Sequence, residues 1–260
     1  MTHADPESDD TVTLGAIGVA GYVFADVVHE AIGHGGACLA NGGHIVLLTS
    51  VYFHCEPGHP LTAAAGPGAN LLAASLLWLA LRLYRNHAAH TRLFFLLAFA
   101  FNVCWGAGQM IYSAALDRED WAFVLEGSMP AWLWRPALGI LGGALYYLGI
   151  RMLAAGLQAY TAANEREARR RARRLLLIPY IASGLAACAA AALYESDPYS
   201  AVREAALETV VANAGIWVLA QRLRLGVATS EPVARVPRKL GWVVTTTLAF
   251  IVFAAVMGRG

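Results

Sequence analysis

Long apolar runs are the feature that most constrains the fold of this chain. A helix needs about 20 predominantly apolar residues to cross the hydrocarbon core of a bilayer, and runs of that length recur along the sequence. Hydrophobic residues make up 58% of the chain and charged residues 14%, which leaves little polar surface for a soluble domain. We predict an all-α polytopic membrane protein with about seven transmembrane helices, near residues 12–33, 61–82, 93–116, 131–157, 175–194, 204–222 and 240–257.

The same pattern divides the rest of the chain. Residues 1–10 are polar and acidic, and we expect them to form a disordered tail. We expect residues 11–260 to form one transmembrane domain, with the candidate site in its core at 12–125 and accessory helices at 131–257. The predicted helix at 204–222 is the weakest of the set, because two glutamates and an asparagine interrupt it.

Basic residues are concentrated in three of the predicted connections. They cluster at 82–92, 166–174 and 222–239, whereas the alternate connections carry few. Because cytoplasmic loops are enriched in Lys and Arg, we expect an integral protein of a bacterial inner membrane with a cytoplasmic N-terminus. The end of the first helix then lies at the outer face. The basic run at 166–174 lacks interleaved aromatic residues, so we expect membrane lipids as partners and no nucleic acid.

The end of the first predicted helix carries ionisable side chains. His29, Glu30 and His34 follow an apolar run in the segment VVHEAIGHGG, and ionisable groups within a membrane segment are usually functional. The helical zinc motif His-Glu-x-x-His places two imidazoles four residues apart on one face, with the glutamate able to activate water. Here the two histidines are five residues apart, which would turn them about 140° from each other on a regular helix.

Two backbone arrangements would accommodate this spacing. A π-bulge within residues 31–35 would return both histidines to one face, with His29 and His34 as metal ligands and Glu30 as general base. Alternatively, Glu30 and His34 form the helical pair and His29 supports them. We favour the π-bulge or a helix end in this stretch. Asp26 lies one turn before His29, and we expect it to orient the second ring nitrogen of that histidine.

A polar stripe runs along the third predicted helix. Asn102 and Gln109 share one face at helical spacing, and the same period continues to Asp117 and Asp120 at the outer end. A zinc site that keeps an open position for water has three protein ligands, and Asp120 or Asp117 is the expected third. The alternative is that both aspartates belong to a hydrated acidic loop.

The connection between the first two predicted helices has strand character. Residues 42–53 are rich in β-branched and aromatic side chains and too short to span as a helix, so we predict a strand or short hairpin at the membrane face. The next helix opens with small residues and Pro67, and we expect Asn70 to be buried there. The four cysteines are scattered without C-x-x-C spacing, so we predict neither a disulfide framework nor a thiolate zinc site.

These motifs together resemble the site-2 protease family of intramembrane zinc metalloproteases. The resemblance covers about residues 20–125 and rests on His29-Glu30 with His34, the β-like segment, the run AGPGAN, and an aspartate at the end of a later helix. In that family, two histidines and an aspartate bind zinc while the glutamate activates water. The resemblance therefore implies His29, His34 and Asp120 as zinc ligands, and Glu30 as the base that acts on a transmembrane peptide.

The expected function is that of a membrane-embedded zinc metallohydrolase, most simply a protease-like peptidase. A non-proteolytic zinc hydrolase of a lipid amide or ester would use the same chemistry. Membrane di-iron desaturases and hydroxylases also carry His-x-x-x-x-His spacing, and a non-catalytic transporter or scaffold would not need Glu30. The residues expected to support the ligands or bind substrate are Asp26, Asn70, Asn102, Gln109 and Asp117.

Overall fold

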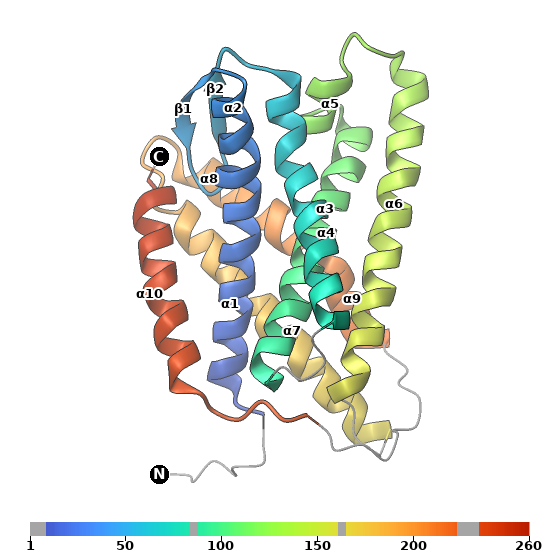
Figure 1. Cartoon of the computed structure of the whole chain (residues 1–260), viewed down its shortest axis with the longest axis vertical. Helices are drawn as coiled ribbons and strands as arrows, with labels where there is room; N and C mark the ends of the chain where they lie inside the picture. Colours follow the sequence, from blue (N-terminus) through green and yellow to red (C-terminus); the bar gives the residue numbers. More distant parts are fainter. Residues whose placement is uncertain (1–8, 84–87, 161–164, 223–233, 260) are drawn as a thin grey trace.

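The protein is a bundle of long helices with a short β-hairpin at one end (Figure 1). The computed structural model describes residues 9–83, 88–160, 165–222 and 234–259. In chain order the elements are α1 (Thr11–Val27), the π-helix η1 (Val28–Gly35), α2 (Gly36–Ala40), β1 (His44–Leu48), β2 (Phe53–Glu56), α3 (Pro60–Leu83), α4 (Ala89–Leu116), α5 (Glu119–Leu125), α6 (Ala131–Gly156), the 3₁₀ segment η2 (Leu157–Tyr160), α7 (Glu165–Ala191), α8 (Pro198–Ala205), the π-helix η3 (Ala206–Val211), α9 (Ala214–Arg222) and α10 (Leu240–Met257).

Six helical passages of the described chain are long and apolar enough to cross a membrane. They are Thr11–Ala40, Pro60–Leu83, Ala89–Leu116, Ala131–Tyr160, Arg166–Ala191 and Leu240–Met257. Each overlaps a predicted span, so the helical fold class is confirmed at this level. The fifth passage begins earlier than predicted, because the basic run itself forms the first turns of α7.

The prediction of one continuous helix at 204–222 is wrong. This part of the chain is divided into α8, η3 and α9. Because α7 ends and α10 begins at opposite ends of the bundle (Figure 1), the three short pieces return the chain through it. Polar groups explain the division: the buried Asn213 side chain donates to the Thr209 carbonyl at 2.8 Å, and Glu208 lies within the π-helical turn.

α4 is the centre of the packing. Its residues 96–107 are buried on every face, including the large side chains of Phe101 and Trp105. A helix that is apolar all round needs partners on all sides, and α4 packs against α1, α3 and α6. On the other side of α1 lies α7, and Gly18 permits this approach because a Cβ there would overlap the backbone of Pro179.

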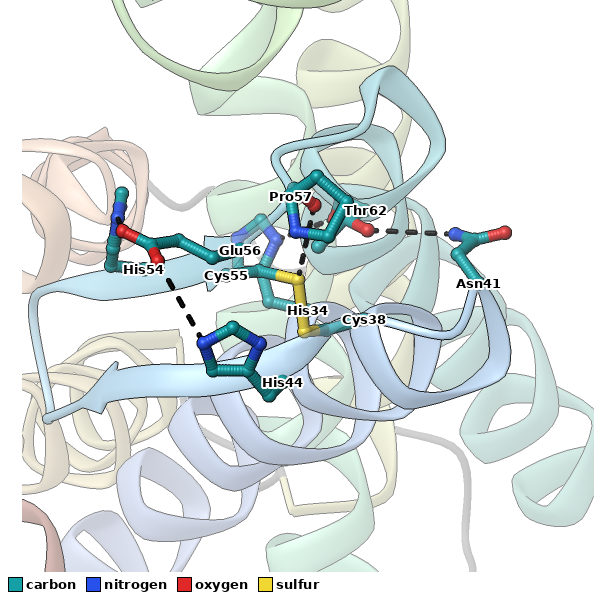
Figure 2. Close-up of a disulfide and its surroundings, with 9 residues drawn as sticks. All are labelled: His34, Cys38, Asn41, His44, His54, Cys55, Glu56, Pro57 and Thr62. Carbon is teal, nitrogen blue, oxygen red and sulfur yellow. Dashed lines mark hydrogen bonds and ion pairs between the residues drawn. A yellow bond between two sulfur atoms is a disulfide. The ribbon is translucent and has the colours of Figure 1, made fainter.

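The predicted strand or hairpin is present as the antiparallel pair β1 and β2. A disulfide joins Cys55 of β2 to Cys38 of α2, 17 residues earlier, with a Cα–Cα distance of 6.0 Å (Figure 2). The prediction of no disulfide framework therefore missed this bond. Cysteine spacing alone could not show it, because the hairpin register is what brings Cys55 back over the end of α2.

Two residues of the predicted tail at residues 1–10 take part in the fold, namely Asp9 and Asp10. Residues 1–8 lie outside the described chain. Asp10 Oδ1 accepts a hydrogen bond from the Thr13 backbone at 2.8 Å and caps α1. Asp9 is buried against Arg171 of α7, whose guanidinium donates to both carboxylate oxygens at 2.5 and 2.8 Å. This pair ties the residue before the N-cap of α1 to α7, and α1 begins at the end of the bundle opposite the hairpin (Figure 1).

Candidate metal centre

The two histidines of the first passage lie on a π-helix. η1 covers Val28–Gly35 between two α-helical segments, and a π turn closes i→i+5 hydrogen bonds. Residues five apart therefore come to lie on one face, and the Nε2 atoms of His29 and His34 are 3.2 Å apart. The predicted π-bulge is confirmed. The alternative arrangement, a regular α-helix that pairs Glu30 with His34, does not form.

Asp120 completes a group of three side chains of metal-ligand type. It lies in the first turn of α5, and its Oδ2 is 3.6 Å from His29 Nε2 and 3.5 Å from His34 Nε2. Donor atoms of a tetrahedral zinc site, each about 2.0–2.1 Å from the ion, are roughly 3.3 Å from one another. The three observed separations bracket this value, so the geometry fits a zinc-sized cation.

The hydrogen bonds of His29 determine which of its ring nitrogens is free. Its Nδ1 contacts Asn70 Oδ1. The Asn70 amide nitrogen already donates to the Ala25 carbonyl at 3.1 Å and to Asn102 Oδ1 at 2.8 Å, so the oxygen must face the histidine. Because that oxygen can only accept, His29 Nδ1 carries the hydrogen and Nε2 presents a lone pair.

His34 is oriented in the same way. Its Nδ1 lies 2.8 Å from the backbone carbonyl oxygen of Thr62, which can only accept a hydrogen bond. The Nε2 atoms of His29 and His34 therefore face each other as two acceptors at 3.2 Å. Two facing lone pairs repel unless a proton or a cation lies between them, and this donor set is the one metal-ligating histidines present.

The third member of the triad is a carboxylate. Burial alone would raise the pKa of Asp120, but with a proton between the imidazoles the hydrogen bonds and positive charge of His29 and His34 outweigh this effect and hold the pKa well below its usual range. A carboxylate and two imidazole lone pairs thus converge on one point. Imidazole and carboxylate are both established zinc ligands.

Packing holds both imidazole rings in place. Trp105 of α4 stacks on His29 with ring centroids 5.1 Å apart, and Phe53 of β2 stacks on His34 at 5.3 Å. The backbone of α3 lies directly against His34 at Gly66, where a Cβ would overlap the ring. The sequence analysis did not identify Trp105 or Phe53, because their roles depend on contacts between elements.

Glu30 lies beside the triad on η1. It is 3% exposed, and its Oε2 atom has no hydrogen-bond partner within the described chain. It directly follows His29 in the same π-helix that carries His34. A buried carboxylate oxygen without a partner next to a metal-ligand set is available to accept a proton from water.

The turn before α5 brings Asp120 rather than Asp117 to the triad. Asp117 ends α4 with a φ of 57°, and Glu119 has a φ of 67°, a left-handed conformation that is uncommon for residues other than glycine. Asp117 Oδ2 lies 3.7 Å from an Arg135 guanidinium nitrogen, and its side chain is more than half exposed. Asp117 therefore lies at the surface, away from His29 and His34.

The other predicted support residues have mixed placements. Asn70 and Asn102 are fully buried and form the hydrogen-bonded chain behind His29. Asp26 is also fully buried, but it does not orient His29 as predicted, because Asn70 occupies that position. Both Asp26 carboxylate oxygens lack a hydrogen-bond partner among the described residues. Gln109 is buried on α4, in the wall of a neighbouring cavity.

Three comparisons with known proteins found no similar protein. A scan against protein-family models, a search of curated proteins and a search of solved structures each find no match for this chain. The functional argument therefore rests on the residues and geometry of the site.

Proposed function

We propose that this chain is a membrane-embedded zinc metallohydrolase, and that it acts as a protease-like peptidase on membrane peptides. The observation that carries the proposal is the convergence of His29 Nε2, His34 Nε2 and Asp120 Oδ2 within 3.6 Å of one another. The Nδ1 atoms of both histidines face hydrogen-bond acceptors, so their Nε2 lone pairs point toward each other and toward Asp120. The triad lies at one end of helices long and apolar enough to cross a membrane.

The residues of the site suit hydrolysis. When bound, zinc would supply a Lewis acid that polarises a carbonyl group and lowers the pKa of water. Glu30 would accept a proton from the attacking water at its unpartnered Oε2 and pass it to the leaving amine. Asn70 and the Thr62 carbonyl keep the imidazoles in the ligating tautomer throughout.

The placement of the other histidines argues against a di-iron oxidase. His44 and His54 lie on the exposed hairpin beside Glu56. His90 bonds the Pro237 carbonyl at 2.8 Å, at the far end of the bundle. His3 and His87 lie outside the described residues. Within the described chain, His29, His34 and Asp120 are the group that could hold a metal ion, and it is sized for one ion.

Metal analysis of the purified full-length protein tests the proposal. We expect about one zinc per chain, which His34→Ala and Asp120→Asn should abolish because each removes a ligand. Glu30→Gln should keep the zinc and lose hydrolysis of transmembrane peptides, because the base is not a ligand. Asp117→Asn is the matched control: it removes a carboxylate three residues from Asp120 and should keep both metal and activity.

Different outcomes would select the alternatives. Two irons per chain would support the oxidase class. Zinc loss in Glu30→Gln, with zinc retained in His29→Ala, would make Glu30 a ligand and contradict the mechanism. Cleavage of lipid amides or esters but not of peptides would retain the metal centre and replace the peptidase by a lipid hydrolase.

A further inference from the structure

A cavity of about 420 Å³ lies next to the candidate metal centre, between α4, α6, α8 and η3. We call it the Glu208 cavity. Two of its lining residues connect it to the ligands: Trp105 stacks on His29, and Glu119 immediately precedes Asp120 in the chain. A substrate held at the metal centre could therefore place a neighbouring side chain in this cavity.

Two buried hydrogen-bond acceptors in its wall have no partner. Gln109 is 7% exposed, and its Oε1 atom makes no hydrogen bond within the described chain. The Oε2 atom of Glu208 is likewise buried and without a partner there. Leaving a buried polar atom unpaired costs about 1–3 kcal/mol. Both atoms accept hydrogen bonds, so the group that satisfies them is a donor.

The charge of the cavity favours a cation. Glu119, Glu204 and Glu208 line it, and no Lys, Arg or His is among its lining residues. Glu204 is already paired with Arg203 at 2.8 Å, whereas Glu208 Oε2 has no partner in the described chain. A cationic donor would satisfy this oxygen and pair with the carboxylate.

The rest of the wall is apolar and aromatic. Ile111, Leu207 and Val211 supply aliphatic surface, and Tyr112 adds an aromatic ring. Such walls accommodate an aliphatic stem while a charged end reaches the polar atoms. Glu208 is presented by the π-helix η3, and π turns within helical segments occur frequently at functional sites.

We propose that the Glu208 cavity binds a primary ammonium or guanidinium group on an aliphatic stem, namely a lysine or arginine side chain of the peptide substrate. The inference rests on the proposed function and names its substrate class: peptides with a basic residue close to the cleaved bond. The stem lies along the apolar wall, and the charged end donates to Gln109 Oε1 and Glu208 Oε2. A neutral side chain of the same length leaves both acceptors unpaired and binds more weakly.

The binding of small probe molecules tests the cavity without a measurement of enzyme activity. Isothermal titration of the full-length protein in a nonionic detergent would compare n-hexylammonium with n-hexanol, which has the same stem and no charge. We expect hexylammonium to bind at least tenfold more tightly. Glu208→Gln should weaken hexylammonium binding at least tenfold, and Gln109→Leu should weaken it as well. Glu195→Gln, which removes an exposed carboxylate after α7, should leave the affinity unchanged.

The same titration separates this inference from the proposed function. In the Asp120→Asn variant, hexylammonium binding should persist although zinc binding and hydrolysis are lost, because Asp120 does not line the cavity. Equal affinity for hexylammonium and hexanol in the unsubstituted protein would overturn the inference. An unchanged hexylammonium affinity in both Glu208→Gln and Gln109→Leu would overturn it as well. Peptide hydrolysis without any preference for Lys or Arg over norleucine near the cleaved bond would also overturn it.

Discussion

At the scale of single residues, Gly66 sets the space available to the His34 ring. A Cβ at this position would overlap Nε2, Cε1 and Cδ2 of the imidazole. The ring cannot move away freely, because Phe53 stacks on its face at 5.3 Å and the Thr62 carbonyl holds its Nδ1 at 2.8 Å. The absence of a side chain at one residue of α3 is therefore part of the geometry of the candidate metal centre.

Gly66→Ala should weaken zinc binding at least tenfold, because the His34 imidazole must leave its ligating position. The helix itself should tolerate the change, since alanine favours helix by about 1 kcal/mol over glycine. Gly68→Ala is the control on the same helix, because a Cβ there meets nothing within 4 Å. Competition with a chelator would measure both affinities. Zinc affinity equal to that of the unsubstituted protein in Gly66→Ala would show that the ring is not a ligand.

At the scale of elements, the hairpin holds one side of the candidate metal centre. Phe53 of β2 contacts His34 directly, and the disulfide between Cys38 and Cys55 ties the same strand to the end of α2 (Figure 2). The hairpin also bonds to the last helix, because the Ser50 backbone nitrogen donates to the Met257 carbonyl at 2.7 Å. Removing the disulfide would therefore loosen the support of the His34 ring.

Cys55→Ser should lower the free energy of unfolding by about 3 kcal/mol, the amount expected when a cross-link closing a loop of about 15 residues is lost. Thermal unfolding in detergent would measure the change. Dithiothreitol should lower the Tm of the unsubstituted protein and have no further effect on Cys55→Ser. Cys188→Ser, which removes a free cysteine of α7, is the control. A Tm insensitive to the reductant in the unsubstituted protein would contradict the role of the disulfide.

The pair formed by Asp9 and Arg171 joins α1 to α7. Burial alone would raise the pKa of Asp9, but the hydrogen bonds from Arg171 outweigh it and lower the pKa below its ordinary value of 3.8. A carboxyl whose pKa is lower in the folded than in the unfolded state stabilises the fold above the unfolded pKa. That stabilisation is lost as the pH falls through the lowered value.

Asp9→Asn should therefore destabilise the protein by about 3 kcal/mol at neutral pH, because it leaves the Arg171 charge buried and unpaired. The difference from the unsubstituted protein should shrink below about pH 4. Glu167→Gln is the control, since this exposed carboxylate lies 3.9 Å from Arg235 and such pairs contribute less than about 1 kcal/mol. Denaturation at several pH values would measure both. A pH-independent difference for Asp9→Asn would show that its charge does not contribute.

At the scale of the whole molecule, the hairpin and the start of α1, next to which Asp9 pairs with Arg171, lie at opposite ends of the bundle (Figure 1). The described basic residues of α7 lie at the Asp9 end, which the positive-inside rule assigns to the cytoplasm. The metal-ligand triad and the disulfide are at the other end. Disulfides persist in oxidising compartments, so we predict that the end carrying the triad and the disulfide faces away from the cytoplasm.

Cysteine labelling in intact cells tests this orientation. In a background with Cys104→Ser and Cys188→Ser, Ser128→Cys on the hairpin side should react with an impermeant maleimide from outside. Glu167→Cys, at the other end of the bundle, should react only after the membrane is permeabilised. The reverse pattern would place the candidate metal centre on the cytoplasmic side.

The sequence by itself determined the helical membrane fold class and the approximate positions of six long helices, and it favoured the π turn that unites His29 with His34 over a regular helix. These features follow from local rules: the length of apolar runs is set by the bilayer, and side-chain direction is set by residues per turn. The chemistry of a histidine pair with an adjacent glutamate is local as well. Each could therefore be predicted without knowing which helices are neighbours.

Tertiary structure decided the features that depend on contacts between distant segments. The packing of η1 against α3 gives His29 the partner Asn70 rather than the nearby Asp26. The turn before α5 presents Asp120 and leaves Asp117 with Arg135. The hairpin register joins Cys38 to Cys55. In each case several partners were compatible with the local sequence, and the choice followed from which backbones the close-packed bundle brings together.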